Sequence, residues 1–227
     1  MDYVGGLRDL RSHVLRTIGD PDVRFQEDPV RMLRAIRFGA GLGFEMEPKV
    51  EAALIRHAPH LMRAAKARLF EEVLRLLRSG SSEQAMYLCQ RYGVLAVIFP
   101  ELDTWLKRGV GRQEGWRALL CRLDAAVRGG SLPPDELLIL LLHWGPSLEL
   151  ISKHRHPGHA LYQSFAPLVE HLALPRRFRE QIRQLGVAYK RSGSELSGQE
   201  PSKGAHRQRS RFAELRQQVR WLKHFVD

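Results

Sequence analysis

Residues 26–38 read QEDPVRMLRAIRF, in which an Asp-Pro pair precedes apolar residues at helical spacing. Aspartate is a preferred helix cap and proline a preferred first helical residue, so we predict a helix that begins at Asp28-Pro29. It should run to the glycines at 41 and 43. Three arginines recur every third residue along it, and on a helix of 3.6 residues per turn their directions drift by about 60° per step. They are Arg31, Arg34 and Arg37.

Apolar residues at every third or fourth position continue through most of the chain, and no convincing run alternates with a period of two, so we predict an all-α protein. Further helices are expected in KVEAALIRHA after Pro48, in AKARLFEEVLRLLRSG up to Gly80, and in SSEQAMYLCQRYG, with a serine at its start and Gly93 at its end. Pro100 should divide VLAVIFPELDTWL into two short segments. The helical pattern continues to about residue 190.

The C-terminal part of the chain changes in composition. Residues 191–210, RSGSELSGQEPSKGAHRQRS, are small or charged and contain one leucine, which predicts a flexible connector. RFAELRQQVRWLKHFV should then form a last helix that packs on the body through one apolar stripe. The stripe consists of Phe212, Leu215, Val219, Leu222 and Val226.

The charge of the chain indicates the class of its partner. Among 227 residues, 36 Lys and Arg face 25 Asp and Glu, a net charge of +11. Residues 151–227 hold 15 of the basic and 6 of the acidic side chains. Such a balance favours polyanions such as nucleic acid, and binding to this region should weaken as salt rises.

The segment RRFREQIRQLGVAYKR is the strongest candidate for contact with RNA. Basic side chains could hold phosphates while Phe178 and Tyr189 stack on bases. The alternative is an amphipathic helix whose apolar residues, including Ile182 and Leu185, face the core while its arginines are solvated. We expect both together. The basic residues are Arg176, Arg177, Arg179, Arg183, Lys190 and Arg191.

Several classes of protein and site are disfavoured. No stretch is apolar enough to enter a membrane, and the N-terminus lacks the apolar core of a signal peptide. Cys89 and Cys121 are too few for a disulfide framework or a cysteine zinc site, so a cytoplasmic location is expected. KHRHPGH gathers three histidines, but Lys153 and Arg155 would repel a cation, and we interpret it as a polar loop. The three histidines are His154, His156 and His159. No metal site is predicted.

Three segments in order resemble a known family. DYVGGLRDL, RTIGDPDVRFQEDPVRMLRAIRFGAGLGF and KARLFEEVLRLL look like the class II nucleotidyltransferases, which comprise bacterial poly(A) polymerases and CCA-adding tRNA nucleotidyltransferases. The likeness is dense over residues 2–80 and weak beyond about residue 105. ARLFEEVLRLL and YGVLAVIFPEL look more like the poly(A) polymerase branch.

The resemblance implies that Asp28 and Arg31 recognise the base of an incoming ATP. A carboxylate can accept from an amino group and a guanidinium can donate to a ring nitrogen, a pair that adenine and cytosine both offer. Residues three apart lie on one helical face. The alternative is that Asp28 only caps the helix and pairs with Arg31. Arg34 and Arg37 are expected either to contact triphosphate or to pair with carboxylates.

The resemblance also implies supporting residues. Arg68, with Glu71 or Glu72, would brace the base-reading helix so that its donors and acceptors stay fixed. Asp2, Gly5, Gly6 and Asp9 match the family's hinge between a catalytic head and a helical neck, since adjacent glycines permit unusual backbone conformations. An ordinary glycine turn before a locally capped helix is the alternative.

The family's catalytic motifs precede the region of resemblance. Nucleotidyl transfer uses two metal ions, which the family holds with carboxylates of an N-terminal catalytic head domain. The resemblance begins after the motifs of that domain. Mg²⁺ is therefore expected only through the head domain, and the chain is expected to be inactive alone. Asp20-Pro21-Asp22 is the one local mimic, and we expect it in a loop without a metal role. Whether the chain is itself an enzyme stays open at this point.

The sequence and the resemblance together predict the neck and body of a poly(A) polymerase that adds adenylates from ATP to RNA 3′ ends. RNA and a nucleotide are the expected partners, and a separate catalytic head domain is a further candidate. The alternatives are a CCA-adding fragment and a non-catalytic helical RNA-binding module. We expect five regions: a hinge and connecting helix (1–25), a nucleotide-recognising neck (26–105), an RNA-binding body (106–190), a flexible linker (191–210) and a C-terminal helix (211–227).

Overall fold

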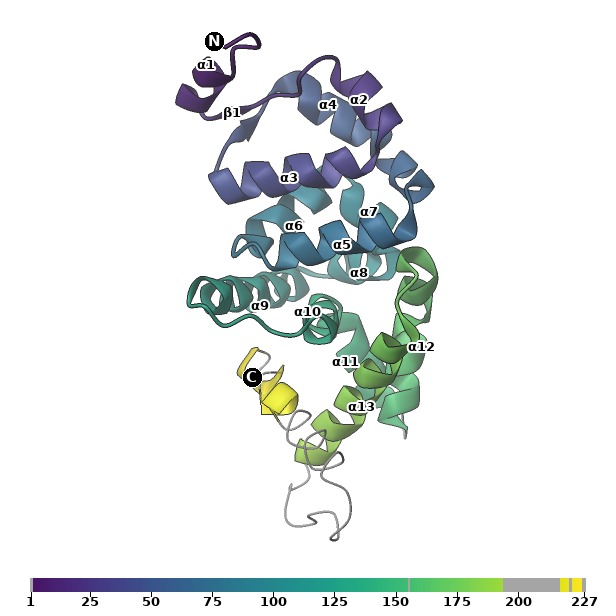
Figure 1. Cartoon of the computed structure of the whole chain (residues 1–227). Helices are drawn as coiled ribbons and strands as arrows, with labels where there is room; N and C mark the ends of the chain where they lie inside the picture. The colour runs from purple at the N-terminus through teal and green to yellow at the C-terminus, as the bar shows by residue number, and fades with distance from the viewer. Residues whose placement is uncertain (1, 155, 194–216, 221, 226–227) are drawn as a thin grey trace. The chain divides into compact units, whose positions relative to one another are not determined.

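The computed structural model describes residues 2–154, 156–193, 217–220 and 222–225 (Figure 1). Helices make up almost all of the regular structure, so the prediction of an all-α protein is confirmed. Contacts divide the described residues into unit 1, residues 2–132 with 171–173, and unit 2, the rest. This division falls after Leu132, whereas the sequence suggested a boundary between neck and body near residue 105.

Unit 1 begins with the elements that carry the sequence motifs. They are α1 (Gly6–Arg11), β1 (Val14–Leu15), α2 (Pro21–Glu27), α3 (Val30–Leu42), β2 (Glu45–Met46) and α4 (Pro48–His57). The two strands pair in parallel. The unit continues with the 3-10 helix η1 (Ala58–Arg63), then α5 (Lys66–Leu77), α6 (Ser82–Arg91), α7 (Val94–Ile98), α8 (Pro100–Leu106) and α9 (Val110–Arg128).

Helix α3 is central to unit 1, because it packs against both α5 and α6 (Figure 1). Burying one large aliphatic side chain contributes about 1.5–3 kcal/mol relative to leaving it exposed, so the apolar face of α3 fixes the helix firmly. The arginines project from its other faces. The buried hydrophobic side chains of α3 are Val30, Met32, Leu33, Ala35, Ile36 and Ala40.

The helix boundaries largely follow the turn and cap residues of the sequence. Helix α3 ends at Leu42, and Gly43 takes the left-handed backbone conformation (φ 65°) that suits a terminating glycine. Pro48 opens α4, and Pro100 opens α8 directly after α7. These glycine and proline boundaries are confirmed. Helix α3 begins at Val30, with Pro29 at the cap position, one residue later than predicted.

The segment before Asp28 is not the loop that the sequence suggested. Asp20 caps α2 by accepting a hydrogen bond from the backbone N–H of Asp22 at 2.9 Å, and Pro21 is the first residue of the helix. The loop prediction is wrong because Asp-Pro starts a helix here for the same reason as at Asp28-Pro29.

The N-terminus of α6 is capped by a distant residue. Ser81, at the cap position, makes no side-chain capping bond. Instead the buried carboxylate of Asp124, in α9, accepts from the backbone N–H groups of Ser82 at 2.6 Å and Glu83 at 2.9 Å. A carboxylate there satisfies two free donors and faces the positive end of the helix dipole. Asp124 therefore joins α9 to α6.

We expect Asp124→Ala to lower the free energy of unfolding by about 2 kcal/mol, because two backbone donors of α6 lose their acceptor. Urea denaturation followed by circular dichroism measures the loss. Glu114→Ala is the matched control, since Glu114 is an exposed acidic residue of the same helix. A loss no larger than that of the control would show that the cap contributes nothing.

Unit 2 contains α10 (Asp135–Leu142), α11 (Trp144–Lys153), all but the last two residues of α12 (Pro157–Leu172) and α13 (Arg176–Gly193). Six consecutive residues of α10, Leu137–Leu142, are buried, and α13 packs against this helix. Helices α12 and α13 approach closely at Gly158, where a Cβ atom would lie 2.7 Å from Val187 Cγ2. The absence of a side chain at Gly158 permits this contact.

A small polar cluster lies inside unit 2. His143, Ser147 and Ser164 are buried, and both hydroxyl oxygens lie near His143 Nδ1, at 3.3 Å and 3.4 Å. His143 Nε2 has no hydrogen-bond partner within the described structure. Burial lowers the pKa of His143 to about 4 from its ordinary value of 6.5. The imidazole is therefore neutral at pH 7.

The C-terminal predictions are partly covered by the structure. Residues 217–220 and 222–225 are helical, and Val219, Leu222 and Phe225 are buried. Phe212, Leu215 and Val226 lie outside the described residues. The linker was predicted to begin at residue 191, but residues 191–193 belong to α13, and the rest of the predicted linker lies outside the described residues. None of the helices in the described part of the chain has the length and hydropathy that a membrane span requires.

Candidate functional site

Asp28 lies at the junction between α2 and α3, where the chain is extended for one residue. Its Oδ2 accepts a hydrogen bond from Arg68 Nη2 at 2.8 Å, and its Oδ1 accepts from the backbone N–H of Val30 at 3.3 Å. Partial burial alone would raise the pKa of Asp28, but the hydrogen bond and charge of Arg68 outweigh it, and the pKa lies below its ordinary value. Asp28 is therefore an ionised acceptor.

Arg31 is held by a different carboxylate. Its Nη1 donates to Glu27 Oε2 at 2.8 Å and lies 3.4 Å from the backbone oxygen of Arg24. The hydrogen bond from Arg31 is the main reason why the pKa of Glu27 is lowered. The alternative to base recognition was that Asp28 caps α3 and pairs with Arg31. Asp28 does accept a hydrogen bond from the first turn of α3, but its ion pair is with Arg68, and Arg31 pairs with Glu27.

Glu72, in α5, organises the next two arginines of α3. Its side chain is 3% exposed, and Arg34 Nε donates to its Oε1 at 3.3 Å. Arg37 Nε lies 3.6 Å from its Oε2, and Arg75 Nη1 donates to its Oε1 at 2.9 Å. Three guanidinium groups therefore share one buried carboxylate. Arg34 and Arg75 donate hydrogen bonds to it, whereas Arg37 contributes only its charge, because neither Arg37 Nε nor Glu72 Oε2 has a hydrogen-bond partner in the described structure.

The neighbouring carboxylate, Glu71, points to solvent instead. Its side chain is 49% exposed and its Oε1 lies 3.4 Å from Arg75 Nε and 3.8 Å from Arg78 Nη1. Of the two glutamates that the sequence left open, Glu72 contacts α3. Through Arg68 and Glu72, α5 thus contacts both Asp28 and the arginines of α3. That these contacts brace the base-reading helix stays a prediction.

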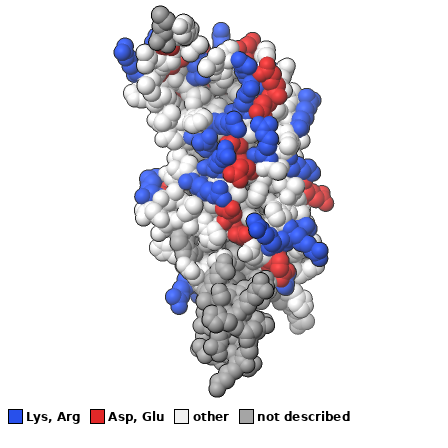
Figure 2. Space-filling model, in the orientation of Figure 1, with Lys and Arg blue, Asp and Glu red and all other residues white. Residues whose placement is uncertain are grey.

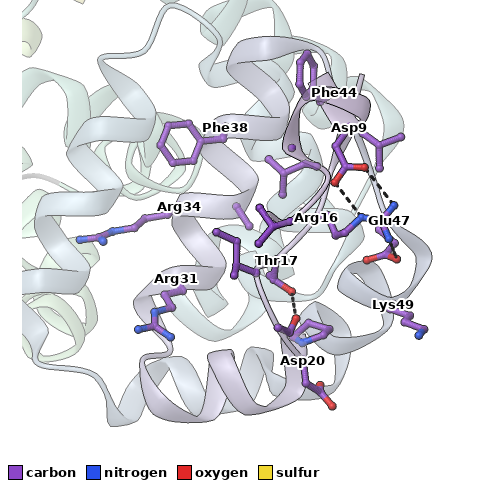
Figure 3. A pocket seen from close by; sticks show the side chains of 18 of the residues that line it. Asp9, Arg16, Thr17, Asp20, Arg31, Arg34, Phe38, Phe44, Glu47 and Lys49 are labelled. Carbon is purple, nitrogen blue, oxygen red and sulfur yellow. Dashed lines mark hydrogen bonds and ion pairs between the residues drawn. The ribbon is translucent and has the colours of Figure 1, made fainter. Parts of the chain in front are cut away.

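A hollow of about 1140 Å³ opens beside α3. Arg31, Arg34 and Phe38 project from α3 in the same direction (Figure 3), and all three line the hollow. The lining also includes residues of the N-terminal segment and of α4, among them Asp9, Arg16, Thr17, Asp20, Glu47 and Lys49. The hollow therefore combines guanidinium groups with an apolar surface. Of the predicted nucleotide-binding residues, Arg31 and Arg34 are among its lining, whereas Asp28 and Arg37 are not.

Two of the predicted hinge residues, Asp2 and Gly5, precede α1, and the other two, Gly6 and Asp9, belong to it. Asp2 accepts hydrogen bonds from the backbone N–H groups of Gly6 at 2.9 Å and Leu7 at 2.8 Å, and Gly5 has a left-handed backbone (φ 75°). This is the local geometry of a glycine turn before a capped helix. Asp9 is paired with Arg16 at 3.0 Å. Movement about these residues stays a prediction.

The carboxylates of the Asp20-Pro21-Asp22 segment are already engaged. Asp20 caps α2, and Asp22 pairs with Arg56 and, at 2.7 Å, with His57 Nε2. The hydrogen bond from Arg56 is the main cause that lowers the pKa of Asp22. Two cationic or donor side chains around one carboxylate do not fit a metal ion. Among the described residues, no group of three His, Cys, Asp or Glu side chains has the arrangement of a metal site.

The predicted RNA-binding residues of α13 lie on an amphipathic helix. Phe178, Ile182 and Leu185 are buried, as expected for an amphipathic helix whose apolar residues face the core. Phe178 is therefore not exposed for stacking on a base. Arg176 and Arg177 are exposed, Arg179 is half-buried, and Arg183 is tied to Glu180 at 2.7 Å. The side chains of Tyr189, Lys190 and Arg191 lie outside the described residues. On the face of the molecule in Figure 2, basic side chains are spread widely with acidic ones between them.

Sequence reasoning missed two residues of the site. Glu27 precedes Arg31 by four residues, a spacing typical of ion pairs within one helix. This pair was not predicted, because Glu27 ends α2 and Arg31 lies in α3, with Asp28-Pro29 between the two helices. Arg75 follows Glu72 by three residues on α5 and could have been found from that spacing.

Comparisons with known proteins find relatives over most of the chain. A family model described as the probable RNA and SrmB-binding site of polymerase A matches residues 43–106. Poly(A) polymerase I of Salmonella typhimurium is 33% identical over 195 residues, which cover 81% of this chain and 42% of the relative. The CCA-adding enzyme of Bacillus subtilis is 30% identical over 181 residues, which cover 71% of this chain and 46% of the relative. The chain thus spans less than half the length of these two relatives.

Two solved structures share the fold. A tRNA nucleotidyltransferase complexed with a primer tRNA and an incoming ATP analog has a TM-score of 0.56 at 24% identity, over 96% of this chain and 60% of that chain. A CCA-adding enzyme with ATP has a TM-score of 0.58 at 21% identity, over 100% of this chain and 49% of that chain. At these identities the likeness concerns the fold alone.

Proposed function

Because the chain belongs to the class II nucleotidyltransferase family over the residues that it shares with these relatives, we propose that it supplies the nucleotide-selecting and RNA-binding part of an RNA 3′-end nucleotidyltransferase. The nucleotide is ATP, and the reaction is the addition of adenylates. The observation that carries the proposal is the Asp28 junction, where an ionised carboxylate and a guanidinium one helical turn apart are each held by a separate partner, Arg68 and Glu27.

The separate anchoring supports base recognition. If Asp28 and Arg31 paired with each other, a base would have to break that ion pair before binding. Here the Arg31 side chain is 40% exposed and uses Nη1 for Glu27, and Asp28 has a second lone pair on each oxygen. An adenine could then donate its amino hydrogen to the carboxylate and accept from the guanidinium at its ring nitrogen. Arg34, which lines the hollow, is placed to meet phosphate.

Adenylate addition is preferred to CCA addition for one reason. The poly(A) polymerase relative is matched over 81% of this chain, against 71% for the CCA-adding enzyme of Bacillus subtilis. The CCA-adding activity is the second candidate, because cytosine offers the same donor and acceptor pair as adenine.

In this proposal, this chain binds the nucleotide and the RNA, and a separate head domain holds the metal ions. Nucleotidyl transfer needs two metal ions held by carboxylates. Asp20 and Asp22 are committed to a helix cap and to Arg56 and His57, so we assign the magnesium ions to a head domain outside these 227 residues. The chain by itself is then expected to bind nucleotide and RNA without catalysing transfer.

The test is nucleotide selectivity. We expect the parent chain to bind a fluorescent ATP analogue more tightly than the matching GTP analogue by about tenfold, a typical discrimination by paired hydrogen bonds. Arg31→Ala should reduce this ratio to about one, because the donor to the ring nitrogen is lost. Arg117→Ala is the matched control, since Arg117 is also paired with a glutamate, Glu83 at 2.6 Å, on another surface.

Equal affinity of the parent chain for both analogues would contradict the proposal. A selective parent whose ratio survives Arg31→Ala would place base recognition elsewhere. Adding CTP as a third ligand separates the two candidate activities, because an enzyme restricted to adenylate should discriminate against CTP and a CCA-adding enzyme should not.

A further inference from the structure

The exposed side of α3 carries an aromatic ring that the proposed function does not use. Phe38 is 47% exposed and lines the same hollow as Arg31 and Arg34 (Figure 3). The other large apolar residues of α3 are buried, except for Leu42 at the end of the helix. About half of the Phe38 surface stays in contact with water, and a ligand in the hollow could cover this part of the ring.

One face of this ring is already occupied. The Cζ atom of Arg37 lies 4.4 Å from the ring centroid, and Arg37 is itself tied to the buried Glu72 at 3.6 Å. Arg37 does not line the hollow, whereas Phe38 does. Arg37 therefore contacts the ring without lining the hollow, and the part of the ring that lines the hollow is open to a flat partner that could stack on it.

The spacing along α3 determines which base this could be. Phe38 follows Arg31 by seven residues, about 10.5 Å along the helix axis. This is about three times the 3.4 Å step between stacked bases, so a base held at Arg31 is too far away to stack on Phe38. Arg34 lies between them, about 6 Å from Phe38 along the axis. Phe38 would therefore meet a second base, with a phosphate near Arg34.

We propose that Phe38 is the stacking platform for the 3′-terminal base of a single-stranded RNA. This deepens the proposed function and rests on it, since the first base of the arrangement is the ATP at Asp28 and Arg31. Unpaired terminal bases are the ones that aromatic side chains can stack on, and such stacking tolerates any base because every base has a π face. Arg37 and Glu72 hold the ring in position.

The test uses the full chain and a short RNA that carries 2-aminopurine at its 3′ end, whose fluorescence falls on stacking. We expect quenching on binding to the parent chain, and we expect Phe38→Ala to abolish the quenching and weaken binding about tenfold. Phe38→Leu should behave like Phe38→Ala, because it keeps apolar area but has no ring. Phe38→Trp should retain quenching and affinity.

Tyr87→Ala is the control, because Tyr87 is an exposed aromatic of α6 outside the hollow, and it should change nothing. Full retention of RNA affinity and quenching in Phe38→Leu would overturn the proposal and identify the ring as part of an apolar protein contact. Unchanged quenching in Phe38→Ala, with affinity that still falls as salt rises, would overturn stacking and leave the proposed function intact. Absence of salt-sensitive RNA binding in the parent would instead contradict both.

Discussion

The free energy of unfolding of the Glu72→Gln variant is expected to be about 3 kcal/mol lower than that of the parent chain, the lower end of what breaking a buried ion pair costs. The carboxylate is 3% exposed and is shared by Arg34, Arg37 and Arg75. A glutamine has the same shape but no charge, so the three guanidinium groups lose their common anion. The lower end applies because these arginine side chains are 24–48% exposed and can turn to water.

Glu71→Gln is the matched control for this variant. Glu71 stands beside Glu72 on α5 and also meets two arginines, but its side chain is 49% exposed. Exposed ion pairs contribute about 0–1 kcal/mol, so the control should lose less than about 1 kcal/mol. Chemical denaturation with circular dichroism measures both. If the two variants lose the same stability, the buried carboxylate is not the anchor of α3.

Acid should destabilise unit 2 through His143. Its pKa is lowered by burial to about 4 in the folded chain, against 6.5 for an ordinary histidine. Between these pH values the unfolded state binds one more proton than the folded state, so stability is complete above pH 6.5 and is lost as the pH falls toward 4. At 1.36 kcal/mol per pH unit the loss attributable to His143 is about 3 kcal/mol.

The measurement is a set of denaturation curves at several pH values for the parent and for His143→Gln, a variant that keeps polarity but does not titrate. Other groups titrate in this range, so the informative quantity is the difference between the two pH slopes. His156→Gln, which removes an exposed imidazole, should keep the slope of the parent. Parallel slopes for the parent and His143→Gln would show that His143 is protonated in the folded state as easily as in the unfolded one.

Local signals in the sequence were sufficient for the helices of unit 1. The apolar spacing after Asp28-Pro29 and the left-handed glycine at Gly43 mark both ends of α3, and prolines mark the starts of α4 and α8. The same Asp-Pro signal was present at Asp20-Pro21, where the prediction gave more weight to the loop expected at this point in related proteins. The helix start followed the local chemistry instead.

The candidate site was predictable in its residues but not in its pairing. The choice between Glu71 and Glu72 could have been made from the sequence, because Leu69, Val73 and Leu76 define the buried face of α5 and only Glu72 lies on that face. The link from Arg68 to Asp28 spans 40 residues, and nothing local indicates it. Contacts of this range depend on how α5 packs against α3, which helical periodicity alone does not determine.

The distant cap on α6 bears on how this protein can be dissected. The family match ends at residue 106, and a fragment cut there would look complete, because it contains all of α6. Yet the carboxylate that finishes the first turn of α6 belongs to a residue 42 positions after Ser82. During synthesis that turn has no acceptor until Asp124 has left the ribosome. A piece of unit 1 that extends through α9 is therefore expected to be more stable than one cut at residue 106.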